Sequence, residues 1–530
     1  MERGGAAAPA ARRPHGARLR RSALSVHRVL HRVRRPSPAG EKGSPDASAH
    51  CYRGRHEARC SRPDDDAGES PGALTADLVR SPGARVPRGF VVPGPLGPGS
   101  AACGSPPQAS PRRFRVETAT MHDHRRLGRE LDLFDTDPLM GAGLPYWLPD
   151  GAAVRHALEE FVRGREQRAG YRHVYSPVLG KRELYEISGH WSHYRDDMFP
   201  PMDLGAEQVV LRPSLCPHHA LIYRSRARSY RELPLRIAEL GGMYRSERSG
   251  VLGGLTRVRA IQLNDAHIFC TPEQAADEAV GALELIREAH RALGIRPVRH
   301  RLSLPGAGGK YVADPVLWER ATALLTEVLE RTGVPFEAVE GEAAFYGPKI
   351  DVQIADAAGR ESTLSTVQID FHQPERFGLH YIGADGAKHR PVMVHRSVIG
   401  SVERVVAHLI ELYGGAFPAW LAPTQLVLLP VSEGEVPQAE RLRRRCLDQG
   451  LRVEVAGPEH GSLGARIREA RSVPYQAVIG PREAADERVA LRLRDGRRLD
   501  PLPAGEALAR IGALVRAFSA ELWEGVPAAA

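Results

Sequence analysis

Cysteine, lysine and long apolar runs are all scarce in this sequence. Six cysteines stand among 530 residues, with no CxxC pair and no regular spacing. This usage argues against a disulfide framework and favours a reducing compartment, so we expect a cytoplasmic protein. The sequence contains no run of about 18 apolar residues, so we expect no membrane-spanning helix. Only five of the 73 basic residues are lysines, which indicates the codon bias of a GC-rich genome.

The formal charge of +9 is distributed unevenly along the chain. Residues 1–120 hold 21 basic and 10 acidic residues, whereas the remaining residues hold 52 basic and 54 acidic ones. Any basic surface on the body of the protein therefore has to be local. Net charge alone does not indicate a nucleic-acid-binding protein.

Residues 1–120 differ from the rest in composition. They are rich in Arg, Ala, Gly, Pro and Ser and show no sustained hydrophobic period. Such a segment buries too little apolar surface to order itself, so we expect a disordered extension. Its Arg-rich start has the character of an organellar transit peptide, but we favour an artefact of start-site choice because Met121 opens a segment of ordinary composition. His27 and His31 form an HxxxH pair that we attribute to chance.

Regular hydrophobic periods begin after Met121. Apolar residues at i, i+3, i+4, i+7 and i+8 predict an amphipathic helix from Val154 to about Gln167. The run YRHVYSPVL follows as a strand broken by Pro177, which is typical of a sheet edge or a strand end. SVERVVAHLIELYG predicts a second amphipathic helix, with Arg404 off its apolar stripe.

The last hundred residues have the pattern of a separate domain. LVLLP, LRVEVA, YQAVIG and VALRLR predict strands, with helices expected at 437–447, 463–470 and 505–522. This β-α-β-α-β-β-α order predicts a compact α/β domain with a mainly parallel sheet.

Two stretches carry residues suited to chemistry. In SLCPHHA, Cys216 stands beside two histidines and is a candidate nucleophile, metal ligand or buried thiol, of which spacing alone favours the buried thiol. In MYRSERSGVLGGLTRVRA, arginines flank a Gly-rich loop, an arrangement that suits a triphosphate clamp because guanidinium groups bind phosphate oxygens bidentately. A solvated charged hairpin is the alternative.

Several longer stretches resemble the class II aminoacyl-tRNA synthetases, and the threonyl-tRNA synthetases in particular. They are DHRRLGRELDLF, SGHWSHYRDDMF, LTRVRAIQLNDAHIFC, AFYGPKIDVQ, VMVHRSVIGSVERVVAHLIE and AFPAWLAPTQ, spread over residues 121–522. The resemblance implies an α+β fold, with an antiparallel-sheet catalytic core over residues 121–420. It further implies a C-terminal α/β anticodon-binding domain over residues 421–530, after the extension at 1–120.

The resemblance also implies roles for residues around the nucleotide and the amino acid. Arg245, Glu247, Arg257 and Arg404 match ATP-binding positions, and Arg245 and Arg404 would stabilise charge on the reacting phosphate. Three further residues match the pocket for threonine: Asp265, Tyr346 and Gln368. Lys349 and His190 match positions near the reacting carboxylate and the terminal adenosine of tRNA.

A zinc site follows from the same resemblance. Cys216, His267 and His395 match the family's three zinc ligands, which implies one Zn²⁺ per subunit, with Mg²⁺ accompanying ATP. Separations of 51 and 128 residues fit no compact zinc finger, and three ligands suit a site with an open position. His219 matches a family histidine, whereas His218 replaces a glycine and is interpreted as a local variation.

The function implied is ATP-dependent ligation of threonine to tRNA(Thr) through a threonyl-adenylate, by a homodimer with Pro177 at its interface. Bacterial relatives carry an N-terminal editing domain that residues 1–120 do not resemble, so we expect no removal of serine in cis. The alternatives are an inhibitor-tolerant duplicate synthetase, a synthetase-like RNA-binding or regulatory protein without charging activity, and, least favoured, a metal-dependent hydrolase.

Some expected pocket residues depart from the family pattern. The family's MNCPGH is SLCPHH here, and Leu263 and Asn264 replace a usual glutamine and aspartate. Residues 362–366 read STLST in place of WQCGT, and Gln373 replaces a leucine. We therefore expect altered pocket walls around unchanged metal and phosphate residues.

Overall fold

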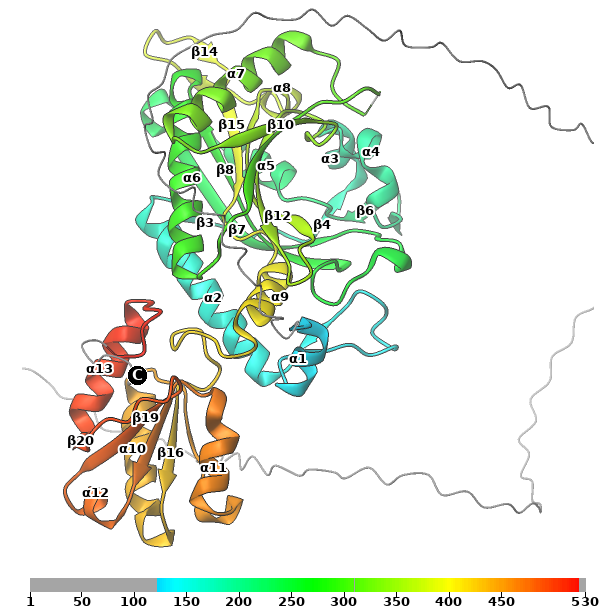
Figure 1. Ribbon diagram of the computed structural model, residues 1–530. Coiled ribbons are helices and arrows are strands. Elements are labelled where there is room, and N and C mark those ends of the chain that lie inside the picture. Colours follow the sequence, from blue (N-terminus) through cyan, green and yellow to red (C-terminus); the bar gives the residue numbers. More distant parts are fainter. Residues whose placement is uncertain (1–121, 309, 524–530) are drawn as a thin grey trace, which may run out of the picture. The chain divides into compact units, whose positions relative to one another are not determined.

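The computed structural model describes residues 122–308 and 310–523 (Figure 1). The predictions for residues 1–120, including the His27 and His31 pair, lie outside this range. Within it, each helix is too short or too polar to cross a lipid bilayer.

An eight-stranded sheet lies at the centre of the larger folded region. Neighbouring strands pair antiparallel except at the two edges, where β10 pairs with β9 and β3 with β7 in parallel. In their order across the sheet the strands are β10 (Phe336–Glu340), β9 (Arg299–Leu304), β11 (Lys349–Ala355), β12 (Glu361–Asp370), β15 (Val392–Ser397), β8 (Ala260–Cys270), β7 (Leu235–Tyr244) and β3 (Arg172–His173). This mainly antiparallel core agrees with the predicted fold class.

The two faces of this sheet differ in character because successive residues of a strand point to opposite sides. In β12, Val367 and Ile369 are fully buried in the largest apolar cluster, whereas Gln368 between them lines a polar cavity. In β8, Ile268 lies in the same apolar cluster and His267 lines the cavity. We call these two sides the apolar face and the cavity face.

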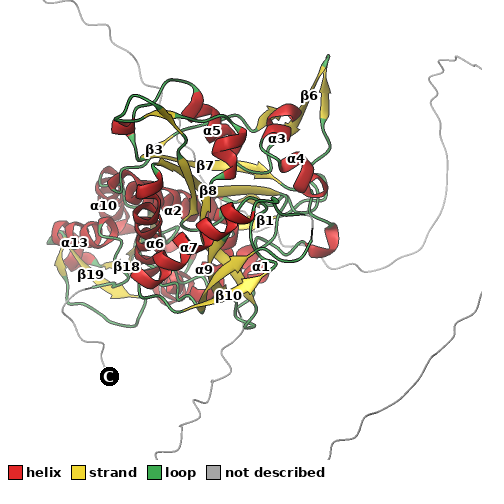
Figure 2. Ribbon diagram, turned by 90° about the horizontal axis from the view of Figure 1, so that it is seen from above, coloured by secondary structure: helices red, strands yellow, loops and turns green. Residues whose placement is uncertain are grey.

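Helices lie on both sides of the sheet. Those that contribute buried side chains to the cluster on the apolar face are α2 (Pro149–Arg168), α6 (Ala275–Ala292), α7 (Pro315–Arg331) and α9 (Val402–Tyr413). The other side carries α3 (Arg182–Ile187), α4 (His190–His193) and α5 (Cys216–Arg224). In Figure 2, β7 and β8 run between α6 and α7 on one side and α3, α4 and α5 on the other.

Shorter elements connect these layers. Three strands, β4 (Leu179–Lys181), β6 (Glu207–Leu211) and β5 (Met202–Leu204), form a small antiparallel sheet. Two further antiparallel pairs are β1 (Phe134–Asp135) with β2 (Tyr146–Trp147) and β13 (Tyr381–Ile382) with β14 (Lys388–His389). The remaining short helices are α1 (His124–Glu130) and α8 (His372–Arg376).

The C-terminal region forms its own sheet and apolar cluster. Its strands, in order, are β17 (Val453–Val455), β16 (Leu426–Pro430), β18 (Tyr475–Ile479), β19 (Arg488–Leu493) and β20 (Leu502–Pro503). Its helices are α10 (Val436–Asp448), α11 (Leu463–Glu469), α12 (Pro481–Ala485) and α13 (Ala504–Arg516). The predicted strands and helices are present in the predicted sequence order, and two short elements were not predicted: α12 between β18 and β19, and β20 before α13.

The prediction of a mainly parallel C-terminal sheet was wrong. β16 pairs in parallel with β17 and β18, but β19 and β20 pair antiparallel. Only residues 480–487 connect β18 to β19, and a parallel crossover needs about a dozen residues or more. The short connection therefore returns the chain antiparallel.

The two predicted amphipathic helices are confirmed as α2 and α9. The strand predicted at YRHVYSPVL is confirmed only in part, since Arg172 and His173 pair at the sheet edge and pairing stops before Pro177. The predicted terminal helix ends at Arg516 instead of Leu522. Phe518 adopts a positive φ of 53°, which is incompatible with a continuing right-handed helix.

Candidate active site

The cavity face of the sheet holds a cavity of about 560 Å³. Every residue that the sequence singled out for a site lines it: His190, Cys216, Arg245, Glu247, Arg257, Asp265, His267, Tyr346, Lys349, Gln368, His395 and Arg404. These residues come from β8, β11, β12, β15, three helices and the loops between them. Positions spread over more than 200 residues of chain thus meet at one place.

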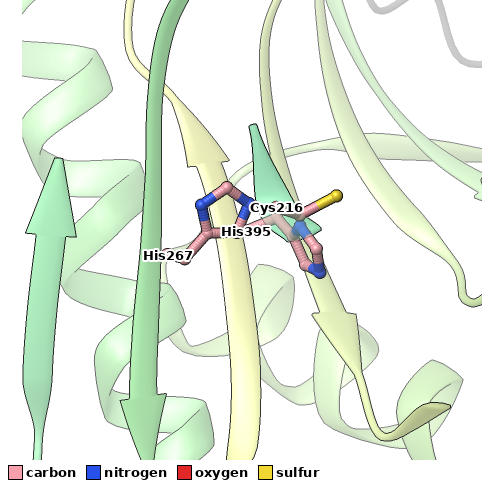
Figure 3. Close-up of side chains that lie close together, drawn as sticks. All are labelled: Cys216, His267 and His395. Atoms are coloured by element: carbon pink, nitrogen blue, oxygen red, sulfur yellow. The ribbon is translucent and has the colours of Figure 1, made fainter. Parts of the chain in front are cut away.

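Cys216, His267 and His395 meet at the inner wall of this cavity (Figure 3). Cys216 is the first residue of α5, while His267 and His395 are directly opposite each other in the antiparallel pair of β8 and β15. One potential ligand atom from each residue lies within 4.8 Å of the other two, and all three side chains are buried. The register of β8 and β15 therefore builds two thirds of this cluster.

Neighbouring side chains orient the two imidazoles. Nε2 of His395 lies 2.8 Å from Oδ2 of Asp370, and Nδ1 of His267 lies 2.7 Å from Nδ1 of His219. These contacts leave Nδ1 of His395 and Nε2 of His267 without a hydrogen-bond partner among the described residues.

The chemistry of this donor set fits a zinc ion. A thiolate and two imidazoles are preferred zinc ligands, and second contacts from a carboxylate or imidazole commonly orient such histidines. Burial raises the pKa of the Cys216 thiol and lowers the pKa of His267 well below its ordinary value. A divalent cation would offset the cost of a buried thiolate, and neutral imidazoles are the form that binds metal.

Three arginines line the same cavity beyond this cluster. Arg404, in the first turn of α9, donates from Nη1 to the carbonyl of Thr363 and from Nε to that of Thr256. Burial, followed by the charges of Arg245 and Arg257, lowers the pKa of Arg404. Mutual repulsion between guanidinium groups in a cavity favours binding of an anion such as a triphosphate.

The other two arginines differ in their partners. Arg257 donates from Nε to Oε2 of Glu247 at 2.9 Å. Nε of Arg245 is buried without a hydrogen-bond partner among the described residues, and its guanidinium lies 5.6 Å from the centre of the Tyr194 ring. Arg245 therefore retains donor capacity toward a ligand in the cavity.

His190 is held by two serine hydroxyls. Its Nδ1 lies 2.8 Å from Oγ of Ser188, and its Nε2 lies 2.9 Å from Oγ of Ser214. Burial, with the charges of His395 and Arg245, lowers the pKa of His190 to about 3. The imidazole is consequently neutral at physiological pH and available to accept or donate through Ser214.

The predicted substrate residues lie around the metal cluster. Tyr346 stacks on His395 with ring centroids 4.8 Å apart, and its hydroxyl donates to Oε1 of Gln368 at 2.7 Å. Oδ2 of Asp265 lies 3.9 Å from Nε2 of His267. Burial raises the pKa values of both Asp265 and Tyr346. Lys349 pairs with Oδ2 of Asp351 at 3.0 Å at the far side.

Sequence reasoning missed the residues that orient the site. Asp370, Ser188 and Ser214 hold the imidazoles of His395 and His190. Ser188 and Ser214 stand in the stretches SGHWSHYRDDMF and SLCPHHA, but sequence reasoning assigned neither serine a role. A signal for Asp370 was available, because it follows Gln368 by two residues and so lies on the same face of β12.

The residues that depart from the family pattern lie in different parts of the structure. Leu263 lines the cavity, as do Ser214 and Thr363. Asn264 instead points to the apolar face, where it donates to Oε1 of Glu166 at 2.8 Å. His218 is buried beside the cluster but is not one of its ligands, and its ring nitrogens have no hydrogen-bond partner among the described residues. Gln373 is buried away from the cavity lining.

Two protein families match most of the described residues. Residues 200–413 match the family described as the tRNA synthetase class II core domain (G, H, P, S and T). Residues 425–514 match the family described as the anticodon binding domain. The first match covers the cavity-bearing sheet except for its edge strand β3, and the second covers the C-terminal sheet.

Curated relatives carry the name threonine–tRNA ligase. The chain is 48% identical over 407 residues to the protein of Geobacillus sp. (strain WCH70), covering 76% of this chain and 63% of that protein. It is 50% identical over 382 residues to the protein of Geobacillus kaustophilus (strain HTA426), covering 71% and 58%. The chain thus spans about six tenths of the length of these relatives.

Solved structures agree with these matches. The structure titled as the RNA binding domain of threonyl-tRNA synthetase from Cryptosporidium parvum Iowa II is 35% identical, with a TM-score of 0.70, and the match covers 74% of this chain and 98% of that chain. A prolyl-tRNA synthetase from Cryptosporidium parvum matches with a TM-score of 0.56 over 74% of this chain and 75% of that one. At 14% identity, the second likeness bears on the fold alone.

Proposed function

The chain belongs to the threonyl-tRNA synthetase family of class II enzymes, and we propose that it ligates threonine to tRNA(Thr) with ATP through a threonyl-adenylate. The observation that carries the proposal is a single cavity that holds a Cys/His/His cluster beside three arginines. A metal-binding cluster selects an amino acid, and a set of guanidinium groups holds a nucleotide. Threonine activation requires the bound amino acid and the bound nucleotide to be in contact with each other.

We assign the first step to the arginines. The carboxylate of threonine attacks the α-phosphate of ATP in line, and negative charge gathers on the phosphorus as pyrophosphate leaves. Arg245 contacts the α-phosphate and the threonine carboxylate, with its free Nε–H as the available donor. Arg404 and Arg257 hold the outer phosphates, and Glu247 lies at the adenine. Mg²⁺ arrives with ATP and neutralises part of its charge.

Selection of threonine is assigned to the cluster. Cys216, His267 and His395 would hold a zinc ion, which would supply Lewis-acid binding of the amino and hydroxyl groups of threonine. Valine lacks that hydroxyl, so it leaves polar partners in the pocket unpaired and is rejected strongly. Asp265 and Gln368 line the remainder of the amino-acid pocket, with Tyr346 fixed over His395.

The second step transfers the threonyl group to the 3′ end of tRNA. We place the terminal adenosine near His190, whose neutral imidazole and Ser214 partner form a path for the proton of the attacking hydroxyl. Lys349 balances charge near the reacting carboxylate. The C-terminal domain contributes tRNA recognition, with the arginine-rich stretches RLRRRC and ALRLRDGRRL as its basic surface.

Three further features belong to this proposal. The catalytic domain extends over residues 121–420 and the anticodon-binding domain over 421–530, in line with family matches that end at 413 and begin at 425. The enzyme acts as a homodimer, with Pro177 in the interface. It works in the cytoplasm, which is supported by the three buried free thiols of the described residues.

Serine is expected to be the main wrong substrate. It keeps the hydroxyl and lacks one methyl group, a difference that a pocket converts into only about 1–3 kcal/mol. We propose that serine is not removed in cis after mischarging, because residues 1–120 do not resemble the N-terminal editing domain that bacterial relatives carry. Correction would then come from a separate activity.

The test is ATP–pyrophosphate exchange by the full chain with threonine, serine and valine, alongside zinc analysis of the purified protein. We expect one zinc per chain, exchange with threonine, slower exchange with serine and none with valine. Zinc without exchange for any of the three amino acids would overturn the proposal and favour a synthetase-like RNA-binding or regulatory protein without charging activity.

One alternative is favoured by a specific observation. Ser214, Leu263 and Thr363 line the cavity at positions where the family has other residues. Such walls suit a duplicate synthetase that tolerates an inhibitor of a second copy. Measuring exchange in the presence of a threonyl-adenylate mimic, for wild type and for Leu263→Gln, separates the two: tolerance that Leu263→Gln abolishes supports the duplicate.

A further inference from the structure

A line of hydrogen bonds runs from the metal cluster into the protein interior. Nδ1 of His267 lies 2.7 Å from Nδ1 of His219, and Nε2 of His219 lies 3.2 Å from Oε2 of Glu239. Glu239 in turn accepts from the hydroxyl of Ser176 at 2.6 Å and from Nη2 of Arg212 at 3.0 Å. These partners lie on α5, β7, β8 and the loops before β4 and α5.

The line has a definite donor direction. A carboxylate oxygen only accepts hydrogen bonds, so Nε2 of His219 carries the proton that it donates to Glu239. In neutral His219, Nδ1 is then an acceptor, and Nδ1 of His267 has to be the donor to it. This leaves Nε2 of His267 unprotonated, with its lone pair available to a metal ion.

Glu239 is well suited to impose this direction. It is 3% exposed, and it receives four hydrogen bonds: from His219, Arg212, and both the backbone N–H and the hydroxyl of Ser176. Burial opposes the charge, but the hydrogen bonds of His219 and Ser176 and the charge of Arg212 together lower the pKa of Glu239 to about 2. The carboxylate is therefore ionised at every pH at which the protein is studied.

An amide at this position cannot do the same. Four donors converge on the two oxygens of Glu239, whereas a glutamine offers one oxygen and one NH₂ group. A glutamine therefore turns its own donor either to His219 and the hydroxyl of Ser176, or to Arg212 and the backbone N–H of Ser176. If it faces His219, the ring is driven to the opposite tautomer, which protonates Nε2 of His267 and removes the metal's lone pair.

We propose that Glu239 is a positioning residue that sets the tautomers of His219 and His267 and thereby the affinity of the cluster for zinc. The inference rests on the proposed metal site and assigns to Glu239 a role that involves no contact with substrate. Ser176 and Arg212 act through Glu239 by holding its carboxylate in place.

The primary experiment compares Glu239→Gln with Glu278→Gln. Glu278 is a matched control because it is also buried and pairs with an arginine, Arg236, through two contacts of 2.6 Å, yet it contacts no histidine. Zinc affinity is measured by competition with a chromogenic chelator. We expect Glu239→Gln to weaken zinc binding about 10–100-fold and Glu278→Gln to leave it within twofold of wild type.

A second readout separates positioning from general destabilisation. Co²⁺ bound in the cluster reports ligand identity through its d–d and sulfur charge-transfer absorption, and thermal unfolding of the metal-free proteins reports stability. We expect an altered cobalt spectrum only in Glu239→Gln, even where both variants lose the same stability. Equal zinc affinity and equal spectra in both variants would overturn the inference.

Two measurements remain decisive if Glu239→Gln does not fold. Ser176→Ala removes one of the four donors and should weaken zinc binding by a smaller factor, about 2–10-fold. In wild type, ¹⁵N shifts of His267, identified by its loss in His267→Gln, should report a protonated Nδ1. An Nε2–H tautomer in the metal-free protein overturns the role of Glu239, whereas a wild type that binds no zinc overturns the metal site itself.

Discussion

The apolar face and the cavity face of the eight-stranded sheet are built from the same strands and differ in what they hold: the largest apolar cluster on the first, and the cavity beside a smaller apolar cluster on the second. On the apolar face, Val367, Ile369 and Ile268 are completely buried among helix side chains. On the cavity face, Gln368 and His267 line an open polar space. One step along the backbone separates a residue that holds the fold together from one that meets the ligand.

This alternation lets one set of strands serve two purposes with little interference. The apolar face buries hydrocarbon, and each buried aliphatic side chain contributes about 1.5–3 kcal/mol to folding. The cavity face gathers arginines and buried imidazoles whose mutual repulsion and desolvation oppose folding. Substitutions on the two faces should therefore give separable effects on stability and on activity.

The largest effect is expected from Ile369→Ala on the apolar face. Ile369 is fully buried, and removing an isoleucine side chain from a packed core costs about 2–5 kcal/mol in the free energy of unfolding. Urea unfolding measures this loss, while threonine-dependent pyrophosphate exchange per folded molecule should stay within threefold of wild type. Loss of exchange without loss of stability would show that the apolar face contributes to activity and not to folding.

Arg404→Ala on the cavity side should show the reverse. Loss of a fixed cation that holds the triphosphate of ATP should lower the rate about 10²–10³-fold, which corresponds to about 2.7–4 kcal/mol. We expect that reduction in kcat/KM for ATP, with a urea midpoint equal to or above that of wild type because Arg404 is itself destabilised by burial. A lower midpoint with normal exchange would contradict the assignment.

Glu403, next to Arg404 on α9, gives a pH-dependent test. Burial raises the pKa of Glu403 from its ordinary 4.5 to about 7, despite hydrogen bonds from backbone N–H groups. The folded state thus binds the proton more tightly than the unfolded state. Its contribution to stability is complete below pH 4.5 and is lost as the pH rises through 7.

Glu403→Gln should remove that dependence. The variant is expected to exceed wild type in unfolding free energy at pH 8 by up to roughly 3 kcal/mol and to match it at pH 4.5. Urea unfolding at pH 4.5, 6 and 8 measures the difference. A constant difference across these pH values would show that the pKa of Glu403 is the same in the folded and unfolded states.

The smallest effect is expected from a residue on neither face. Arg126 pairs with Glu130 at 3.1 Å in α1, and both side chains are more than half exposed. Exposed i,i+4 pairs contribute about 0.3–0.5 kcal/mol. Arg126→Ala should therefore leave both the free energy of unfolding and the rate of pyrophosphate exchange close to wild type. A change in either quantity would mean that α1 contributes to stability or to activity.

Local pattern was enough to predict the elements that bury one face. The apolar stripes of α2 and α9 were sufficient to predict both helices, because a 3.6-residue period is set by neighbours within a few turns. Local pattern did not predict structure that depends on a contact with a residue distant in sequence. The strand before Pro177 is short. Ser176 donates its backbone N–H to the side chain of Glu239 in β7 and not to a backbone carbonyl of that strand.

The site was predictable in its members and not in its arrangement. Resemblance to a family singled out Cys216, His267 and His395, whereas separations of 51 and 128 residues carry no information on contact. Their meeting depends on the register of β8 and β15. The contact of Glu239 was also not predictable, because a lone carboxylate in a strand looks the same whether it faces solvent or an imidazole.

The direct pairing of His267 with His395 makes the cluster sensitive to how the sheet was assembled. If β15 slipped by one residue, His395 would turn to the opposite side and only one imidazole, that of His267, would remain in the cluster. Misassembled molecules would then fail to retain a metal ion even if their hydrocarbon core had collapsed. The metal content of a purified sample would accordingly measure the fraction of molecules that had folded correctly, a quality check available before any assay of turnover.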